Sequence, residues 1–183
     1  YQAMPELMDI GIHGGLGFYV GADRKNSNIT ITMVYQSGLS LPNRDYYLKE
    51  DQTYKDIREA FSSHIVNMYE LMGFENGGSA AEQVLALETE LARISWSKLE
   101  RRNPHTSYNI RYVDQYDQKL KNIQLRHLLT GYGINDIDSM VVGQPSYIEG
   151  LDSLMAVTDI NTFKSYFRWA IINTYSRYIN ADM

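Results

Sequence analysis

The alternation of apolar and polar positions near the start of the chain predicts a β-hairpin. Over residues 29–35, apolar side chains alternate with threonines and a valine, which is the period of a strand. A short apolar run over residues 17–21 and a polar turn precede it, so we predict a hairpin over residues 17–36. One face of its second strand would carry Ile29, Ile31, Met33 and Tyr35. Because a hairpin alone is marginally stable, we expect a helix or further strands to pack against it.

Beyond residue 51 the apolar positions recur every three or four residues, so we predict that residues 51–183 are mainly helical. The first helix ends near Gly73 and has an apolar stripe made of Tyr54, Ile57, Phe61, Ile65, Met68 and Met72. The next is predicted to begin at a capping box of Ser79 and Glu82 and to run toward Leu99, before Asn103-Pro104 stops it. The apolar face of this helix would carry Val84, Leu87, Leu91 and Ile94.

Charged side chains on this second helix suggest a solvated face. Glu82, Glu88 and Glu90 lie along it, and Arg93 follows Glu90 by three residues. Such pairs stabilise a helix by only a few tenths of a kcal/mol. We therefore expect these carboxylates to face water rather than to form a catalytic pair.

The remaining segments have clearer boundaries. Residues 1–10 resemble the tail of a helix that Gly11 closes. Residues 113–131 predict one bent helix or two short ones, and residues 140–142 predict either a strand or a linker. A helix is expected from Pro145 to about residue 156. The last helix, capped by Thr158-Asp159, would have an apolar stripe of Phe163, Phe167, Ala170, Thr174 and Tyr178.

Composition excludes several kinds of site. The chain has 183 residues, no cysteine, and 17 Lys+Arg against 22 Asp+Glu. Disulfides, thiolate zinc sites and cysteine nucleophiles are therefore excluded. The net charge of -5 and the absence of a large basic cluster argue against a nucleic-acid partner. No run approaches the roughly 20 apolar residues of a membrane span.

Motifs for catalysis are also absent from the sequence. A helical zinc site needs two histidines one turn apart, and neither His64 nor His127 has a histidine four residues on. We therefore expect His13, His64, His105 and His127 to be unpaired histidines of a surface or interface. No G-x-S-x-G elbow occurs, and the glycine-rich residues 11–17 lack the ending of a phosphate-binding loop. Taken alone, these patterns indicate a mainly α protein with a short N-terminal β-hairpin and no visible active site.

One segment is much more specific. Residues 38–48 read Gly-Leu-Ser-Leu-Pro-Asn-Arg-Asp-Tyr-Tyr-Leu, which resembles the G-L-x-L-P-x-R-D-Y-Y signature of the neprilysin and endothelin-converting-enzyme family of zinc metalloendopeptidases. Further matches follow in the same order, including residues 87–92, 102–104 and 144–147. The resemblance implies that residues 1–183 are a single fragment of the helical N-terminal region, of the PepO-like type, that covers the active-site cavity and limits substrate size.

The resemblance also indicates where the chemistry lies. Family members bind zinc through an H-E-x-x-H helix and an E-x-x-x-D motif, and neither occurs here. It therefore implies no catalytic residue, metal ligand or cofactor in this chain, zinc in the parent enzyme, and no peptidase activity for the fragment alone. The implied partners are the catalytic domain of the same polypeptide and small peptide substrates. The parent would be secreted, periplasmic or at the cell surface.

The signature residues themselves are expected to be structural: Leu41, Pro42, Arg44, Asp45, Tyr46 and Tyr47. Arg44 and Asp45 would fix the turn between the hairpin and the first helix, and the two tyrosine rings would pack against it. Two alternatives remain open at this stage. The chain could be a free-standing helical module that binds a peptide or glycan, or an autonomous enzyme that uses its scattered histidines and carboxylates.

Overall fold

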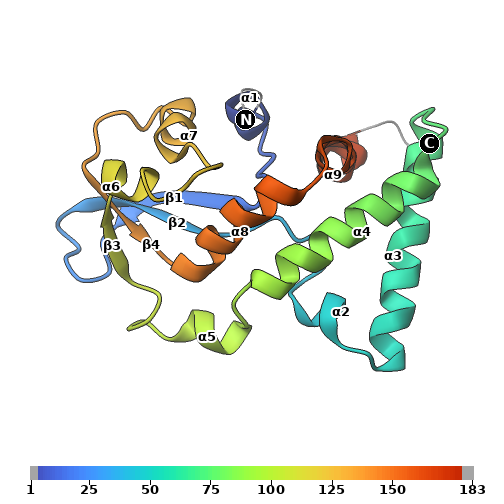
Figure 1. The fold of residues 1–183 in the computed structure, drawn as a ribbon, viewed down its shortest axis with the longest axis horizontal. Coiled ribbons are helices and arrows are strands. Elements are labelled where there is room, and N and C mark those ends of the chain that lie inside the picture. The colour runs from blue at the N-terminus through green and yellow to red at the C-terminus, as the bar shows by residue number, and fades with distance from the viewer. Residues whose placement is uncertain (1–3, 179–183) are drawn as a thin grey trace. The chain divides into compact units, whose positions relative to one another are not determined.

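The computed structural model describes residues 4–178 and shows a mainly α protein with one small sheet (Figure 1). Its residues group into two compact units, each made of two stretches of the chain. Within the described residues, the first unit contains residues 4–38 and Ile94–Val157. The second contains Leu39–Arg93 and residues 158–178. The predicted fold class is therefore confirmed.

The predicted hairpin is present in the first unit and belongs to a four-stranded sheet. Strands β1 (Leu16–Ala22) and β2 (Thr30–Gln36) pair antiparallel, with Leu16 opposite Gln36. β4 (Ser139–Val142) pairs parallel to β2, and β3 (Asn109–Tyr112) pairs antiparallel to β4, so the order is β1-β2-β4-β3. β4 confirms the strand, one of the two alternatives predicted for residues 140–142, whereas the prediction of helices over residues 51–183 is wrong for β3. Both have four residues, too few for their period to be distinguished from that of a helix.

The face of β2 that is buried is not the face that carries the apolar residues Ile29, Ile31, Met33 and Tyr35. Its buried residues are Thr32, Val34 and Gln36, whereas the apolar set is half-buried or exposed: Ile29, Ile31, Met33 and Tyr35. Gln36 tolerates burial because both the oxygen and the nitrogen of its side-chain amide are hydrogen-bonded. Its Oε1 accepts from the Trp96 N–H at 2.8 Å, and its Nε2 donates to the Trp96 carbonyl at 3.2 Å. Its backbone N–H donates to Gln144 Oε1 at 2.9 Å.

Five α-helices accompany this sheet: α1 (Met4–Asp9), α5 (Lys98–Arg102), α6 (Val113–Asp117), α7 (Leu125–Gly131) and α8 (Pro145–Val157). Residues 113–131 thus form two short helices, one of the two predicted arrangements. α8 begins at its proline as predicted and packs against β2. The predicted N-terminal helix is confirmed over residues 4–9, and residues 1–3 lie outside the described part. Gly11, with φ +78°, follows it.

The second unit is helical. It contains α2 (Asp45–Leu48), α3 (Gln52–Leu71), α4 (Gly77–Ile94, whose last residue belongs to the first unit), α9 (Ile160–Tyr175) and the 3₁₀ turn η1 (Ser176–Tyr178). α3 ends close to Gly73 as predicted, and Asp159 caps α9 by accepting from the Asn161 N–H at 2.8 Å. The core between these helices consists of Phe61, Ile65, Tyr69, Ala80, Ala81, Val84, Trp169 and Ile172.

The predicted limits of α4 are wrong at both ends. The helix begins at Gly77, where a Cβ atom would lie 3.0 Å from the Val66 carbonyl oxygen of α3, so the absence of a side chain permits the close packing. It ends at Ile94 rather than near Leu99, because a capping box formed by Ser97 and Glu100 starts a separate helix, α5. Ser97 Oγ accepts from the Glu100 N–H at 3.3 Å, and the Glu100 carboxylate accepts from the Ser97 N–H at 2.7 Å.

The buried face of α9 also differs from the predicted stripe. Ser165, Tyr166, Trp169 and Ile172 are buried, whereas the stripe is half-buried or exposed: Phe163, Phe167, Ala170, Thr174 and Tyr178. Ser165 is accommodated because its carbonyl accepts from the Tyr69 hydroxyl at 2.9 Å, and its own hydroxyl donates to a glutamine of α4 at 2.7 Å. Among the helices of residues 4–178, none has the length and apolar content to cross a bilayer.

Candidate functional site

The signature segment is anchored by a buried carboxylate in the second unit. Ser40 Oγ donates to Glu88 Oε1 at 2.6 Å, and the Ser40 N–H donates to Glu88 Oε2 at 3.1 Å. The Tyr47 hydroxyl also donates to Glu88 Oε2. Each hydroxyl in turn accepts an N–H: Leu41 donates to Tyr47 at 2.8 Å, and Trp169 Nε1 donates to Ser40 at 2.9 Å. These five residues are called the Glu88 network below.

The Glu88 network joins three parts of the second unit. Ser40, Leu41 and Tyr47 come from the signature segment, Glu88 from α4 and Trp169 from α9. Because each hydroxyl receives a hydrogen bond from an N–H group, its own proton is directed at the carboxylate. The network therefore satisfies the polar atoms of a fully buried glutamate, which is what a buried carboxylate requires.

Burial dominates the electrostatics of the Glu88 network. It raises the pKa of Glu88 to about 7, although the hydrogen bonds from Ser40 and Tyr47 lower it. Burial, together with the neighbouring Glu88 carboxylate, also raises the pKa of the Tyr47 hydroxyl well above its ordinary value. Glu88 is 0% exposed, so its carboxylate has no surface from which to meet a substrate. The arrangement can fix backbone, but it cannot act as an acid or base on a bound molecule.

The prediction that Glu88 lies on a solvated face is therefore wrong. Glu82 and Glu90 are exposed, and Glu90 pairs with Arg93 at 3.0 Å as predicted. Glu88 instead follows Val84 by four residues and precedes Leu91 by three, which places it on the buried stripe of α4. That spacing was a signal available in the sequence, because a carboxylate within an apolar stripe needs partners supplied by other segments. No comparable signal in the sequence indicated the roles of Ser40 and Trp169.

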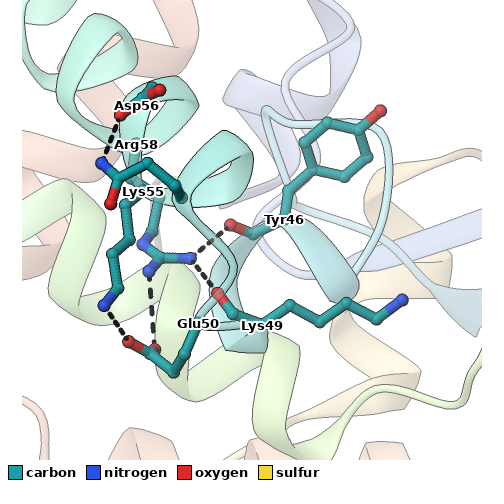
Figure 2. Close-up of polar contacts among 7 residues, drawn as sticks. Tyr46, Lys49, Glu50, Lys55, Asp56 and Arg58 are labelled. Carbon is teal, nitrogen blue, oxygen red and sulfur yellow. Dashed lines mark hydrogen bonds and ion pairs between the residues drawn. The ribbon is translucent and has the colours of Figure 1, made fainter.

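The other end of the signature segment is held by Arg58 of α3 (Figure 2). Its Nη1 donates to the Tyr46 carbonyl at 3.0 Å and to the Lys49 carbonyl at 2.8 Å. Its Nη2 lies 3.5 Å from Glu50 Oε1, and Glu50 also pairs with Lys55 at 3.5 Å. The guanidinium thus satisfies carbonyl groups at the end of α2, which has only four residues and cannot satisfy them internally.

The remaining signature residues line this turn with less burial. The Asp45 N–H donates to Asn43 Oδ1 at 2.9 Å, and the Asp45 carboxylate pairs with Lys49 at 3.3 Å. Both side chains of that pair are about half exposed, so its contribution to stability is small. Tyr46 packs edge-on against Tyr54, with 5.3 Å between ring centroids. Leu41 and Arg44 are half-buried and Pro42 is exposed.

Replacing Arg58 tests the hold on this turn. We expect Arg58→Ala to lower the free energy of unfolding by about 1–2 kcal/mol, because two carbonyl groups lose a charged donor. Lys55→Ala is the matched control, since Lys55 makes only an exposed ion pair with Glu50 and its loss should cost under about 0.5 kcal/mol. Urea unfolding followed by circular dichroism measures both. Equal losses in the two variants would contradict the role assigned to Arg58.

The histidines do not converge on one another. His64, His105 and His127 are exposed, as predicted. His13 differs, because it is half-buried and its Nδ1 lies 2.7 Å from the Tyr132 hydroxyl. Burial lowers its pKa. Within residues 4–178, no three His, Asp or Glu side chains come close enough to hold a metal ion.

Solved structures define the class to which this fold belongs. Mycobacterium tuberculosis zinc metalloprotease ZMP1 in an open state matches 98% of this chain and 28% of that protein's chain, with 28% identity and a TM-score of 0.90. The same enzyme in complex with an inhibitor matches with 27% identity and a TM-score of 0.89. PepO from Lactobacillus rhamnosis, at 18% identity and a TM-score of 0.75, shares the fold. The fold is that of a segment of zinc metalloproteases.

Sequence comparison gives the family. Human endothelin-converting enzyme 1 is 29% identical over 171 residues, which cover 88% of this chain and 22% of that protein. The guinea pig (Cavia porcellus) enzyme is 30% identical over 169 residues, with the same coverage. The model for the N-terminal region of Peptidase family M13 matches residues 1–183, and the chain belongs to this family. It spans about a fifth of the length of these curated relatives. The resemblance inferred from the signature is confirmed.

Proposed function

We propose that this chain is the non-catalytic helical region of a longer zinc metalloendopeptidase that cleaves small peptides. Membership of Peptidase family M13 carries this proposal. Two further observations support it: the relatives are more than four times as long as the matched region, and the zinc motif H-E-x-x-H is absent from these 183 residues. In this proposal the zinc ligands and the catalytic residues lie elsewhere in the same polypeptide, and the parent protein is secreted, periplasmic or at the cell surface.

The role we propose for this region is to cover the active-site cavity and to limit the size of the substrates that enter. A wall of packed helices selects by steric exclusion, which discriminates between substrates without binding any of them tightly. Such a wall has to keep its shape. The Glu88 network and Arg58 support this role, because they fix the signature segment at both of its ends. We propose the same structural role for all six signature residues: Leu41, Pro42, Arg44, Asp45, Tyr46 and Tyr47.

Zinc content and peptide hydrolysis test the proposal. The complete gene product should bind one zinc ion and hydrolyse a short fluorogenic peptide, while leaving a folded protein intact. A chelator should abolish the hydrolysis, because zinc polarises the peptide carbonyl and activates water in such enzymes. The 183-residue chain alone should show neither stoichiometric zinc nor turnover. Metal analysis and fluorescence assays measure these properties.

Two outcomes would overturn the proposal. Stoichiometric zinc or peptide turnover in the isolated chain would indicate an autonomous enzyme. If the rest of the gene encoded no H-E-x-x-H motif, the chain would instead be the alternative, a free-standing module that binds a peptide or glycan. If the complete gene product cleaved folded proteins as readily as short peptides, the proposed size-limiting role would be wrong. The assignment as a peptidase would still stand.

A further inference from the structure

A groove crosses the half-exposed face of the sheet in the first unit. Its volume is about 600 Å³, which is within the range of sites that hold small ligands. Tyr19, Met33 and Tyr35 from β1 and β2 line it. These residues lie on the face of the hairpin opposite to buried Val34, so the groove lies on the less buried face of β1 and β2.

The walls of the groove are cationic. Lys98, Arg101 and Arg102 of α5 line it together with Arg24 of the hairpin turn, and no aspartate or glutamate is among the lining residues. Within residues 4–178, the three side chains of α5 form no ion pair with an acidic residue. Four cations therefore gather around one groove in a chain whose net charge is -5. Unpaired cations on a concave surface raise the local concentration of anionic ligands.

A buried hydroxyl in the same groove also lacks a partner. Ser107 is 3% exposed, and its Oγ has no hydrogen-bond partner. Arg24 binds the carbonyl of this residue at 3.1 Å but leaves the hydroxyl free. Buried hydroxyl groups are nearly always hydrogen-bonded, so this one is available to a ligand atom that reaches it. This observation is independent of the charge of the groove.

We propose that this groove binds an acidic peptide segment. The carboxylates would pair with the cations of α5, since guanidinium groups match carboxylates in a two-bond geometry. An apolar side chain of the peptide would lie on Tyr19, Met33 and Tyr35, and a polar atom of the peptide would bond the Ser107 hydroxyl. A small inorganic anion would leave the apolar floor unused. The inference concerns residues of this chain alone and does not depend on the peptidase assignment.

Photo-crosslinking of an acidic peptide to the complete gene product tests the proposal. The probe is a short peptide of glutamates and leucines with one photoreactive phenylalanine analogue, used in the presence of a chelator so that hydrolysis cannot consume it. We expect crosslinks at Tyr19, Met33 or Tyr35, located by mass spectrometry. A matched peptide with glutamine in place of glutamate should crosslink weakly, and added salt should weaken binding of the acidic probe.

Two sets of variants locate the interaction. Lys98→Gln with Arg102→Gln should weaken binding of the acidic peptide about tenfold, because two ion pairs are lost. Lys164→Gln with Arg177→Gln removes the same charge from exposed positions of the second unit and should leave binding unchanged. Ser107→Ala should weaken binding without lowering the unfolding midpoint, because its hydroxyl has no partner in the free protein.

Two results would overturn the proposal outright: crosslinks that all lie outside the groove, or equal losses of binding in the two double variants. A third would be displacement of the photoreactive probe by inorganic phosphate at the same concentration as by unlabelled acidic peptide. The last result would identify a simple anion site. None of these readouts requires hydrolysis, so failure of this proposal and failure of the peptidase assignment are distinguishable.

Discussion

Replacing Trp169 by alanine should destabilise the second unit by about 4 kcal/mol, the largest effect expected of any substitution considered for this protein. Trp169 is 1% exposed and packs edge-on against Phe61, with 5.7 Å between ring centroids. It belongs to the helical core and to the Glu88 network at once. The substitution therefore opens a large cavity and also removes the N–H that Ser40 Oγ accepts. Urea unfolding monitored by circular dichroism gives the free energy.

Two controls separate the cavity from the hydrogen bond. Trp169→Phe retains an aromatic ring but removes the indole N–H, so we expect a smaller loss, on the order of 1–2 kcal/mol. Trp96 is half-buried, and its indole N–H bonds only the exposed Ser146 hydroxyl at 2.7 Å, so Trp96→Ala should cost less than Trp169→Ala. If Trp169→Ala and Trp96→Ala lowered the free energy of unfolding equally, the Glu88 network would not depend on Trp169 of α9.

The second large effect is a dependence of stability on pH that originates at Glu88. The pKa of this residue is about 7 in the folded chain, against an ordinary value of 4.5. Between these values the folded protein holds a proton that the unfolded chain releases, so the stabilisation is complete below about pH 4.5 and is lost as the pH rises through about 7. A shift of this size corresponds to about 3 kcal/mol.

Glu88→Gln removes this titration and should flatten the curve. We expect the free energy of unfolding of the unaltered chain to fall relative to that of Glu88→Gln between pH 4.5 and pH 8, by about 3 kcal/mol in total. Using the difference between the two proteins cancels other titrating groups, such as His13, whose lowered pKa changes stability in the opposite direction. Glu82→Gln, an exposed glutamate on the same helix, is the control and should follow the unaltered chain. Parallel curves for the chain and Glu88→Gln would contradict the argument.

Both predictions concern how one segment is held rather than how a reaction proceeds. The Glu88 carboxylate and the Tyr47 hydroxyl are buried and satisfied, and removing one partner of such a network leaves another without a bond, which costs more than the bond itself contributes. If the proposed function is correct, loss of this network in the complete protein should relax the limit on substrate size before it affects zinc binding. That expectation links the stability of the chain to its proposed role.

The amino-acid sequence alone determined the fold class, the hairpin over residues 17–36 and the family, because these depend on local periodicity and on one uninterrupted signature. It also identified Pro145 and Asp159 as helix starts, since capping acts between residues close in the chain. It did not indicate which face of β2 or α9 is buried. The apolar pattern of a strand or helix distinguishes its faces. Which face is buried depends on the segments that pack against it, and these are far away in the sequence.

Only the tertiary structure decided the roles of the polar residues. Glu88 lies 41 residues after Tyr47, and Trp169 lies 129 residues after Ser40, so no local pattern connects them. A buried carboxylate is tolerated because Ser40 and Tyr47 of the distant signature segment donate to it. The hairpin turn and the loop after α5 meet across 83 residues, where Arg24 binds the Ser107 carbonyl beside the cationic groove. Local chemistry fixes where helices and strands begin, whereas burial and hydrogen bonding of polar groups are settled by contacts that exist only once the chain has folded.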